Sequence, residues 1–205
     1  MAQIICVIGN KGGTGKTTIA HMLCQGFGLL GQKSVYVLTD ISRQPLSKAG
    51  RRYATLDART PDVLAKVEQK LHHMPEWLGV IDGGGNRPDV DEVLHRMANL
   101  VILPFRDSQE DLRTVLTDLE KFPQAVGLPS QWPTNKWQQD AALKNIEQML
   151  DPHRHRLLKP LYAQSATKLL LQEPPPDALP TTVNNACRAL AWQVLDTLGI
   201  ELYRR

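Results

Sequence analysis

The sequence predicts an α/β fold, in which helices cover both faces of a mostly parallel β-sheet and a phosphate-binding loop follows the first strand. Short apolar runs alternate with segments of helical spacing along the chain, as in repeated strand–helix–strand units. The first apolar run, residues 4–8, leads into the segment GNKGGTGKTT at residues 9–18, and a helical pattern follows. This order of strand, glycine-rich loop and helix is the one that a P-loop requires.

The remaining elements follow from the spacing of apolar residues. After a first helix that ends near Gly31, residues 34–39 predict a strand, whereas the polar residues 41–59 predict a loop. Residues 173–180 hold four of the fourteen prolines and predict an extended loop. Further strands are expected over residues 77–82, 100–103, 126–132 and 157–163, and further helices over residues 61–71, 89–98, 112–119, 143–150 and 183–198.

The composition is ordinary for a globular protein. Of the 205 residues, 42% are hydrophobic and 22% charged, and one domain over residues 1–205 accounts for this length. No apolar run approaches the roughly 18 residues of a membrane span, and the start lacks a signal-peptide pattern, so we expect a cytoplasmic protein. The net charge of +3 permits contact with nucleic acid but does not by itself indicate it.

The glycine-rich segment predicts a nucleotide site. Its glycines let successive N–H groups converge on one anion, and the dipole of the following helix favours the same anion. Lys16 supplies a charge for the β- and γ-phosphates, and the Thr17 hydroxyl is placed to hold Mg²⁺. A turn that merely connects strand and helix is the alternative. The predicted nucleotide-binding residues here are Gly12, Gly13, Thr14, Gly15, Lys16, Thr17 and Thr18.

Two aspartates end strands that should lie near this loop. Asp82 closes an apolar strand and precedes three glycines, which fits a carboxylate that holds a water ligand of Mg²⁺; an aspartate that only opens a turn is the alternative. Asp40 ends the second predicted strand and can approach the same ion. The predicted metal-binding residues are therefore Thr17, Asp40 and Asp82.

Lys11 adds a family resemblance. The run KGGTGKTT at residues 11–18 resembles the deviant Walker A motif of the ParA/MinD family of P-loop ATPases, and most of all that of small ParA-type partition ATPases. The resemblance is strong over residues 1–40 and extends over the rest by the order of elements. It implies ATP and Mg²⁺ as cofactors and a homodimer that forms on ATP binding, in which Lys11 contacts the partner's nucleotide. A solvated surface lysine is the alternative.

This chain also departs from the family pattern. Relatives typically read Asp-x-Asp-Pro-Gln where residues 40–44 read DISRQ, so Ser42 stands at the position of a catalytic aspartate. A hydroxyl is a far poorer proton acceptor than a carboxylate at neutral pH. We therefore expect either that Asp40 takes over this role beside the catalytic lysines Lys11 and Lys16, or that ATP hydrolysis is slow and depends on a partner.

The same resemblance implies a base pocket. It assigns Asn135 to the adenine edge and makes the proline-rich loop over residues 174–180 the other wall of the pocket. Two tryptophans, Trp132 and Trp137, that pack in the core around a proline turn are an equally good interpretation of the segment around Asn135.

Three partners are predicted by resemblance: a second copy of the chain, non-specific DNA and a cargo adaptor of the ParB kind, which would make the protein nucleoid-associated. Each basic cluster taken alone is more typical of a solvated surface. No membrane partner is expected, because the last predicted helix has core-like spacing. The candidate DNA-binding residues are Arg51, Arg52, Arg154, Arg156, Lys159, Lys168, Arg188, Arg204 and Arg205.

Two other functions remain open from the sequence. One is a small-substrate P-loop enzyme of the dethiobiotin synthetase kind, which does not need Lys11. The other is a module that binds ATP as a switch and hardly hydrolyses it, which Ser42 makes credible.

Overall fold

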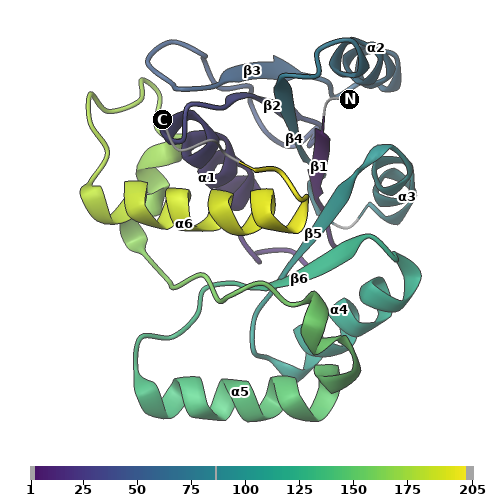
Figure 1. The fold of residues 1–205 in the computed structure, drawn as a ribbon, viewed down its shortest axis with the longest axis vertical. Coiled ribbons are helices and arrows are strands. Elements are labelled where there is room, and N and C mark those ends of the chain that lie inside the picture. The colour runs from purple at the N-terminus through teal and green to yellow at the C-terminus, as the bar shows by residue number, and fades with distance from the viewer. Residues whose placement is uncertain (1–2, 86, 202–205) are drawn as a thin grey trace.

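The computed structural model describes residues 3–85 and 87–201, in which a six-stranded parallel sheet separates two layers of helices (Figure 1). Every pair of neighbouring strands is parallel, so all the carboxyl ends lie along one edge of the sheet. This confirms the predicted fold class. In spatial order the strands are β3 (Ala54–Asp57), β2 (Lys33–Leu38), β4 (Trp77–Asp82), β1 (Gln3–Val7), β5 (Leu100–Phe105) and β6 (Ala125–Pro129).

The helices divide between the two faces of the sheet. On one face α1 (Lys16–Leu29) and α6 (Thr181–Thr197) pack together with the short 3₁₀ helix η2 (Ser165–Leu171). The other face is covered by α2 (Pro61–His72), α3 (Pro88–Met97), α4 (Gln109–Lys121) and α5 (Lys136–Leu150), after which comes the 3₁₀ helix η1 (Asp151–Arg156).

The central strand β1 is apolar throughout because it is covered on both sides. Side chains alternate between the faces of a strand. Ile4 and Cys6 accordingly join the core under α2–α5, whereas Ile5 and Val7 join the core under α1 and α6. All four are fully buried. β1 therefore ends at the middle of the sheet edge, where the glycine-rich segment begins.

Two predictions about strands are wrong. β3 lies within residues 41–59, which predicted a loop; it is an edge strand that pairs only with β2 and is partly exposed, so no apolar run marks it. Residues 157–163 do not form a strand but make two isolated bridges, at Leu157 and Tyr162. Pro160 lies between them and has no N–H to continue a ladder.

Other predicted elements hold with small changes. The sixth strand ends at Pro129 and does not extend to residue 132, and the helix expected over residues 143–150 begins earlier, at Lys136. Among the described residues, no helix is both long and apolar enough to cross a membrane.

Candidate nucleotide-binding site

The loop between β1 and α1 depends on glycine at three positions. Gly9 has φ +140°, Gly13 has φ +78° and Gly15 has φ +90°, backbone conformations that L side chains rarely adopt. Gly15 is also the N-cap of α1, so the loop turns directly into the amino end of that helix. The first N–H groups of a helix have no partner within it, which favours an anion at this place.

Lys16, the first residue of α1, lies beneath this loop. It is only 7% exposed, and its Nζ donates a hydrogen bond of 2.7 Å to the carbonyl oxygen of Lys11. Burial lowers the pKa of Lys16, whereas the negative charges of Asp91, Asp82 and Asp40 oppose that shift. The ammonium group of Lys16 is therefore largely shielded from water at the base of the loop.

A cleft of about 580 Å³ opens in front of Lys16. It lies between the P-loop and the carboxyl ends of β2 and β4, and a Cβ built on Gly85 would stand 3.5 Å from Lys16 Nζ. The structure thus brings most of the predicted nucleotide-binding residues to one place. The cleft is lined by Gly12, Gly13, Gly15, Lys16, Thr17, Thr18, Asp40, Ile41, Ser42, Arg43, Gly84, Gly85 and Arg87.

Asp82 is fully buried beside this cleft, at the end of β4. It accepts hydrogen bonds from the Tyr36 hydroxyl at 2.9 Å and from the Gly84 N–H at 3.4 Å. Burial raises the pKa of Asp82, and hydrogen bonds from Thr17 and Tyr36 oppose that shift. Two of the predicted metal-binding residues, Thr17 and Asp82, are therefore in contact.

Asp40 is held in place by its own loop. Its Oδ1 accepts from the Ser42 N–H at 2.9 Å and from the Ser42 hydroxyl at 2.6 Å, and its Oδ2 lies 3.3 Å from Arg43 Nε. Burial raises the pKa of Asp40, but the contacts with Ser42 and Arg43 outweigh it, and the pKa is lowered. Asp40 is therefore an ionised carboxylate at neutral pH.

The donor set fits Mg²⁺ that arrives with a nucleotide. Thr17, Asp40 and Asp82 offer hydroxyl and carboxylate oxygens, the ligands that Mg²⁺ prefers. In the described part of the chain no three His, Cys, Asp or Glu side chains gather as a metal site. A magnesium ion here would therefore need phosphate oxygens and water to complete its octahedral shell.

Lys11 points away from the cleft lining and pairs with Glu110 in the first turn of α4. Its side chain is 29% exposed and that of Glu110 is 76% exposed. An ion pair so exposed contributes little to stability, on the order of 0–1 kcal/mol, so Lys11 can exchange Glu110 for another anion at small cost.

A second cleft of about 360 Å³ continues from the first and shares Gly15 and Thr18 with it. It is lined also by Met22 of α1 and by residues 161–165. Gln131 borders it with φ +52°, a rare conformation for a non-glycine residue, and its side-chain amide donates to the Gly13 carbonyl at 2.7 Å. The two clefts therefore meet at the amino end of α1.

Asn135 does not line either cleft. It is the N-cap of α5, and its side-chain oxygen accepts from the N–H groups of Trp137 and Gln138 at 2.9 and 3.4 Å. The capping bonds occupy the carbonyl that a base would need. The alternative of two core tryptophans holds for Trp132, which is 4% exposed, but not for Trp137, which is 78% exposed.

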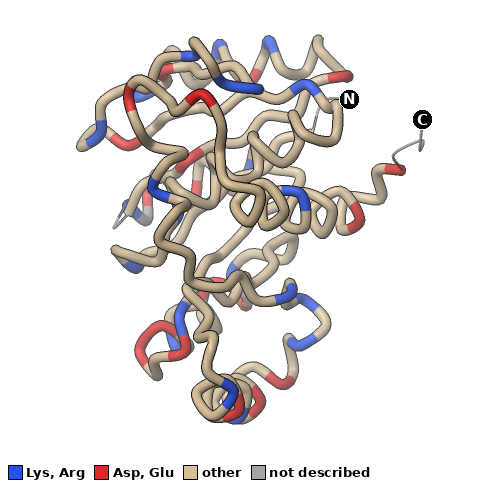
Figure 2. Tube along the Cα trace, turned by 90° about the vertical axis from the view of Figure 1, so that its left-hand side faces the viewer, with Lys and Arg blue, Asp and Glu red and all other residues tan. Residues whose placement is uncertain are grey.

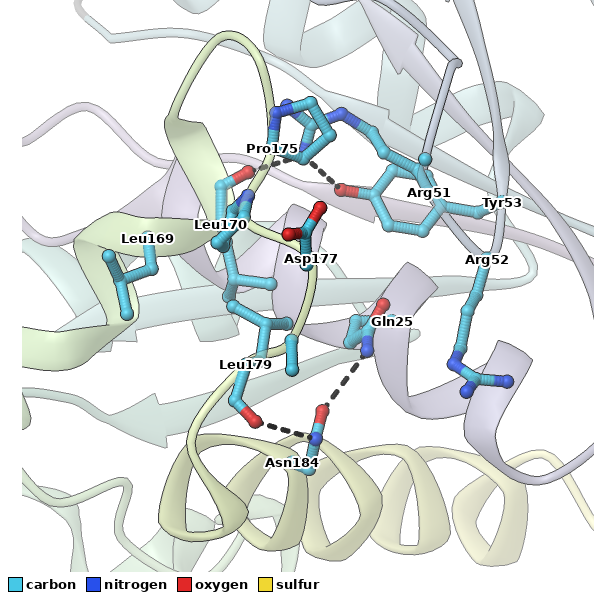
Figure 3. Close-up of a pocket in the computed structure, with 13 residues that line it drawn as sticks. Gln25, Arg51, Arg52, Tyr53, Leu169, Leu170, Pro175, Asp177, Leu179 and Asn184 are labelled. Carbon is cyan, nitrogen blue, oxygen red and sulfur yellow. Dashed lines mark hydrogen bonds between the residues drawn. The ribbon is translucent and has the colours of Figure 1, made fainter.

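The proline-rich loop lines a different cavity, of about 300 Å³, between α1 and α6 (Figure 3). Pro175 and Leu179 face Gln25, Arg51 and Tyr53 there. The loop is not part of the second cleft. The role that the resemblance gave it, as a wall of the base pocket, is therefore not supported by its position.

Two of the basic residues proposed to meet DNA are structural. Arg51, whose side chain is 3% exposed, donates to the Leu170 and Gln172 carbonyls and pairs with Glu173. Arg156 donates to the carbonyls of Leu119, Phe122 and Ala125. Arg204 and Arg205 lie outside the described residues. Figure 2 shows the Lys and Arg positions interspersed with Asp and Glu along the trace.

Sequence patterns did not single out two residues near Lys16. Asp91 on α3 is 3% exposed, and burial raises its pKa to about 6, although the charge of Lys16 opposes that shift. Its position in the first turn of a helix is common for an acid, so nothing in the sequence marks it. Arg87 lines the cleft and donates to the Thr39 carbonyl at 2.7 Å.

Aromatic side chains between the sheet and α1 support Asp82 from the core. Tyr36, which donates to Asp82, stacks on the His21 ring at a centroid distance of 3.8 Å. His21 Nδ1 lies 2.8 Å from the Tyr53 hydroxyl, to which Arg51 also donates. Because His21 follows Lys16 on α1, the same helix positions the phosphate-binding lysine and this buried support.

Comparison with known proteins identifies solved structures that share the fold of this chain. No family model matches the sequence, and no curated protein does either. Solved structures match over nearly the whole chain. McdA from Cyanothece, in a complex with ATP, is 14% identical, with a TM-score of 0.68 and coverage of 100% of this chain and 99% of McdA. MinD from Pyrococcus horikoshii, in complex with Mg-ADP, is 18% identical, with a TM-score of 0.69 and coverage of 98% of both chains.

The pNOB8 ParA bound to nonspecific DNA is 8% identical, with a TM-score of 0.66, and the match covers 98% of this chain and all of ParA. The chain has the ParA/MinD fold. At identities of 8–18% the likeness establishes the ParA/MinD fold, and the roles of single residues rest on the geometry above.

The pH dependence of stability tests whether His21 is buried in its neutral form. Burial lowers its pKa from 6.5 to about 3, with Arg51 and Arg43 adding to the shift. The unfolded state therefore takes up a proton that the folded state refuses, and stability present above pH 6.5 is lost as the pH falls toward 3. Between pH 7 and pH 4.5 the free energy of unfolding should fall by about 2–3 kcal/mol more in the wild type than in His21→Phe.

Urea unfolding at the two pH values measures this difference. His72→Phe, at an exposed position on α2, is the matched control and should behave as the wild type does. Equal pH dependence in the wild type and His21→Phe would contradict a neutral, buried His21.

Proposed function

We propose that this protein is a ParA-like ATPase. It binds ATP and Mg²⁺ in the P-loop cleft, forms a face-to-face homodimer, and in that state binds DNA non-specifically. A ParB-like adaptor that carries plasmid, chromosome or other cargo then stimulates a slow hydrolysis that releases the dimer. The observation that carries this proposal is the buried ammonium of Lys16 under a left-handed glycine loop, beside the contact between Thr17 and Asp82.

Nucleotide binding is supported by the charge and shape of the site. The cleft presents Lys16 and the amino end of α1 to an anion, and Thr17, Asp40 and Asp82 offer the oxygens for its magnesium. The second cleft provides room for a base and sugar. Structures with the same fold contain ATP in McdA and Mg-ADP in MinD.

Dimerisation is supported by the surface around the cleft. Ile41, which lines the cleft beside Asp40, is 66% exposed, and a second copy placed over the cleft would cover it. Lys11 lies at the mouth of the loop on an exposed ion pair with Glu110. A γ-phosphate from a partner's ATP is a stronger anion than a solvated carboxylate, so pairing would draw Lys11 from Glu110.

Slow hydrolysis is supported by the Ser42 hydroxyl, which donates to Asp40 at 2.6 Å. In this arrangement Ser42 offers an attacking water only a hydroxyl, which is a far poorer proton acceptor than a carboxylate, and the Asp40 carboxylate to which it donates is the other candidate acceptor. The same observation favours the second candidate function, a switch module that binds ATP and hardly hydrolyses it.

DNA binding is supported by the exposed Arg52, Lys159, Lys168 and Arg188, and by the complex of pNOB8 ParA with nonspecific DNA.

The dimer is tested by Lys11→Ala. With Mg²⁺ and a non-hydrolysable ATP analogue, light scattering should give the mass of two chains for the wild type and of one chain for Lys11→Ala, while both proteins bind the analogue. Lys33→Ala removes a comparable exposed pair, with Glu76, and should still dimerise. A wild type that binds the analogue as a single chain would contradict the proposed dimer. The site would then be only a nucleotide pocket, as in a small-substrate P-loop enzyme.

Hydrolysis is tested by the basal rate. The loss of a positioned general base typically costs about 10²–10⁴ in rate, so single-turnover hydrolysis by the purified wild type should be slow and should rise with DNA and an adaptor. Rapid hydrolysis of ATP without any partner would show that Ser42 does not limit the reaction.

A further inference from the structure

Arg87 occupies the P-loop cleft although no sequence motif marks it. It comes two residues after Gly85 and directly before α3, and it lines the same cleft as Lys16. Its Nη1 donates a hydrogen bond of 2.7 Å to the carbonyl oxygen of Thr39, just after β2. A cation from the connection between β4 and α3 is thus attached to the end of the neighbouring strand β2.

The surroundings of Arg87 show which end of a nucleotide it would meet. A Cβ built on Gly85 would stand 3.5 Å from Lys16 Nζ, and one built on Gly84 would stand 3.1 Å from Asp40 Cγ. The segment that leads into Arg87 therefore lies against the lysine for the terminal phosphates. The second cleft, which offers room for the base, is lined by neither Gly85 nor Arg87. Arg87 thus stands at the phosphate end.

The positive charge of Arg87 is available for an anion. Among residues 3–85 and 87–201 it forms no ion pair, whereas Arg43, the other arginine of the cleft, lies 3.3 Å from the Asp40 carboxylate. The guanidinium has five N–H donors, and its bond to Thr39 uses one of them on a neutral oxygen. Its planar fork matches the geometry of phosphate oxygens, with which it makes charge-assisted hydrogen bonds.

We propose that Arg87 binds the γ-phosphate in its own subunit and makes the cleft distinguish a nucleoside triphosphate from a diphosphate. This inference rests on the proposed nucleotide binding. With a triphosphate bound, the guanidinium keeps its bond to Thr39 and directs other N–H groups to the γ-phosphate. Loss of that phosphate leaves the bond to Thr39 in place but removes the contact that ties Arg87, and through it the end of β2, to the nucleotide. The residues after β2, which include Asp40 and Ser42, thereby respond to the nucleotide.

The test is equilibrium binding of ATPγS and of ADP, each with Mg²⁺, to the wild type and to Arg87→Gln. Loss of a charge-assisted contact should weaken ATPγS binding by about 10- to 100-fold and change ADP binding by less than about twofold. Arg96→Gln is the matched control, because Arg96 lies on α3, the helix that follows Arg87, and pairs with Glu92 on the surface. It should leave both affinities unchanged.

Arg87→Lys provides a second variant, which keeps the charge but not the fork. It should weaken ATPγS by about three- to tenfold and spare ADP, and it answers the question if Arg87→Gln does not fold. Equal losses for ATPγS and ADP would show that Arg87 only supports the Thr39 carbonyl and would overturn the proposal, as would no loss at all. A wild type that binds neither nucleotide would refute the proposed function itself, and this role of Arg87 with it.

Discussion

The ammonium group of Lys16 is almost fully buried, and the geometry of the cleft depends on what balances its charge. Burial favours the neutral amine and lowers the pKa, while the carboxylates of Asp91, Asp82 and Asp40 favour the cation. The one strong hydrogen bond on Nζ goes to the Lys11 carbonyl, which the left-handed turns at Gly13 and Gly15 bring above it. A buried cation held by a neutral oxygen is stabilised further when an anion enters, which favours phosphate in the cleft.

The parallel sheet places the other parts around this charge. β2 and β4 are neighbours and end at the same edge, so Asp40 and Asp82 both act on the charge of Lys16 at the amino end of α1 although they are far apart in sequence. Beneath them, Tyr36 and His21 fill the space between the sheet and α1, and Tyr36 holds the Asp82 carboxylate. On the other side, the bond from Arg87 to the Thr39 carbonyl joins the end of β2 to the connection between β4 and α3. The site is thus supported from both the core and the surface.

The features that could be predicted from the sequence are those determined by residues close together in the chain. The glycine loop, the apolar central strands and the aspartates that end them each have a local signal, as do most helices. β3 has none, because an edge strand needs no continuous apolar run. Asn135 was assigned to a base by resemblance, yet a local competitor, the cap of α5, takes its carbonyl. Arg87 and Asp91 could not be predicted, since only the crossing from β4 to α3 brings them to Lys16.

The most direct test of the buried cation as the centre of the site is a crystal structure with Mg²⁺ and a non-hydrolysable ATP analogue. We expect the β- and γ-phosphate oxygens to replace the Lys11 carbonyl as partners of Lys16 Nζ, with the metal beside Thr17 and Asp82. A structure in which Lys16 keeps its bond to Lys11, while the analogue lies elsewhere or is absent at saturating concentration, would contradict this.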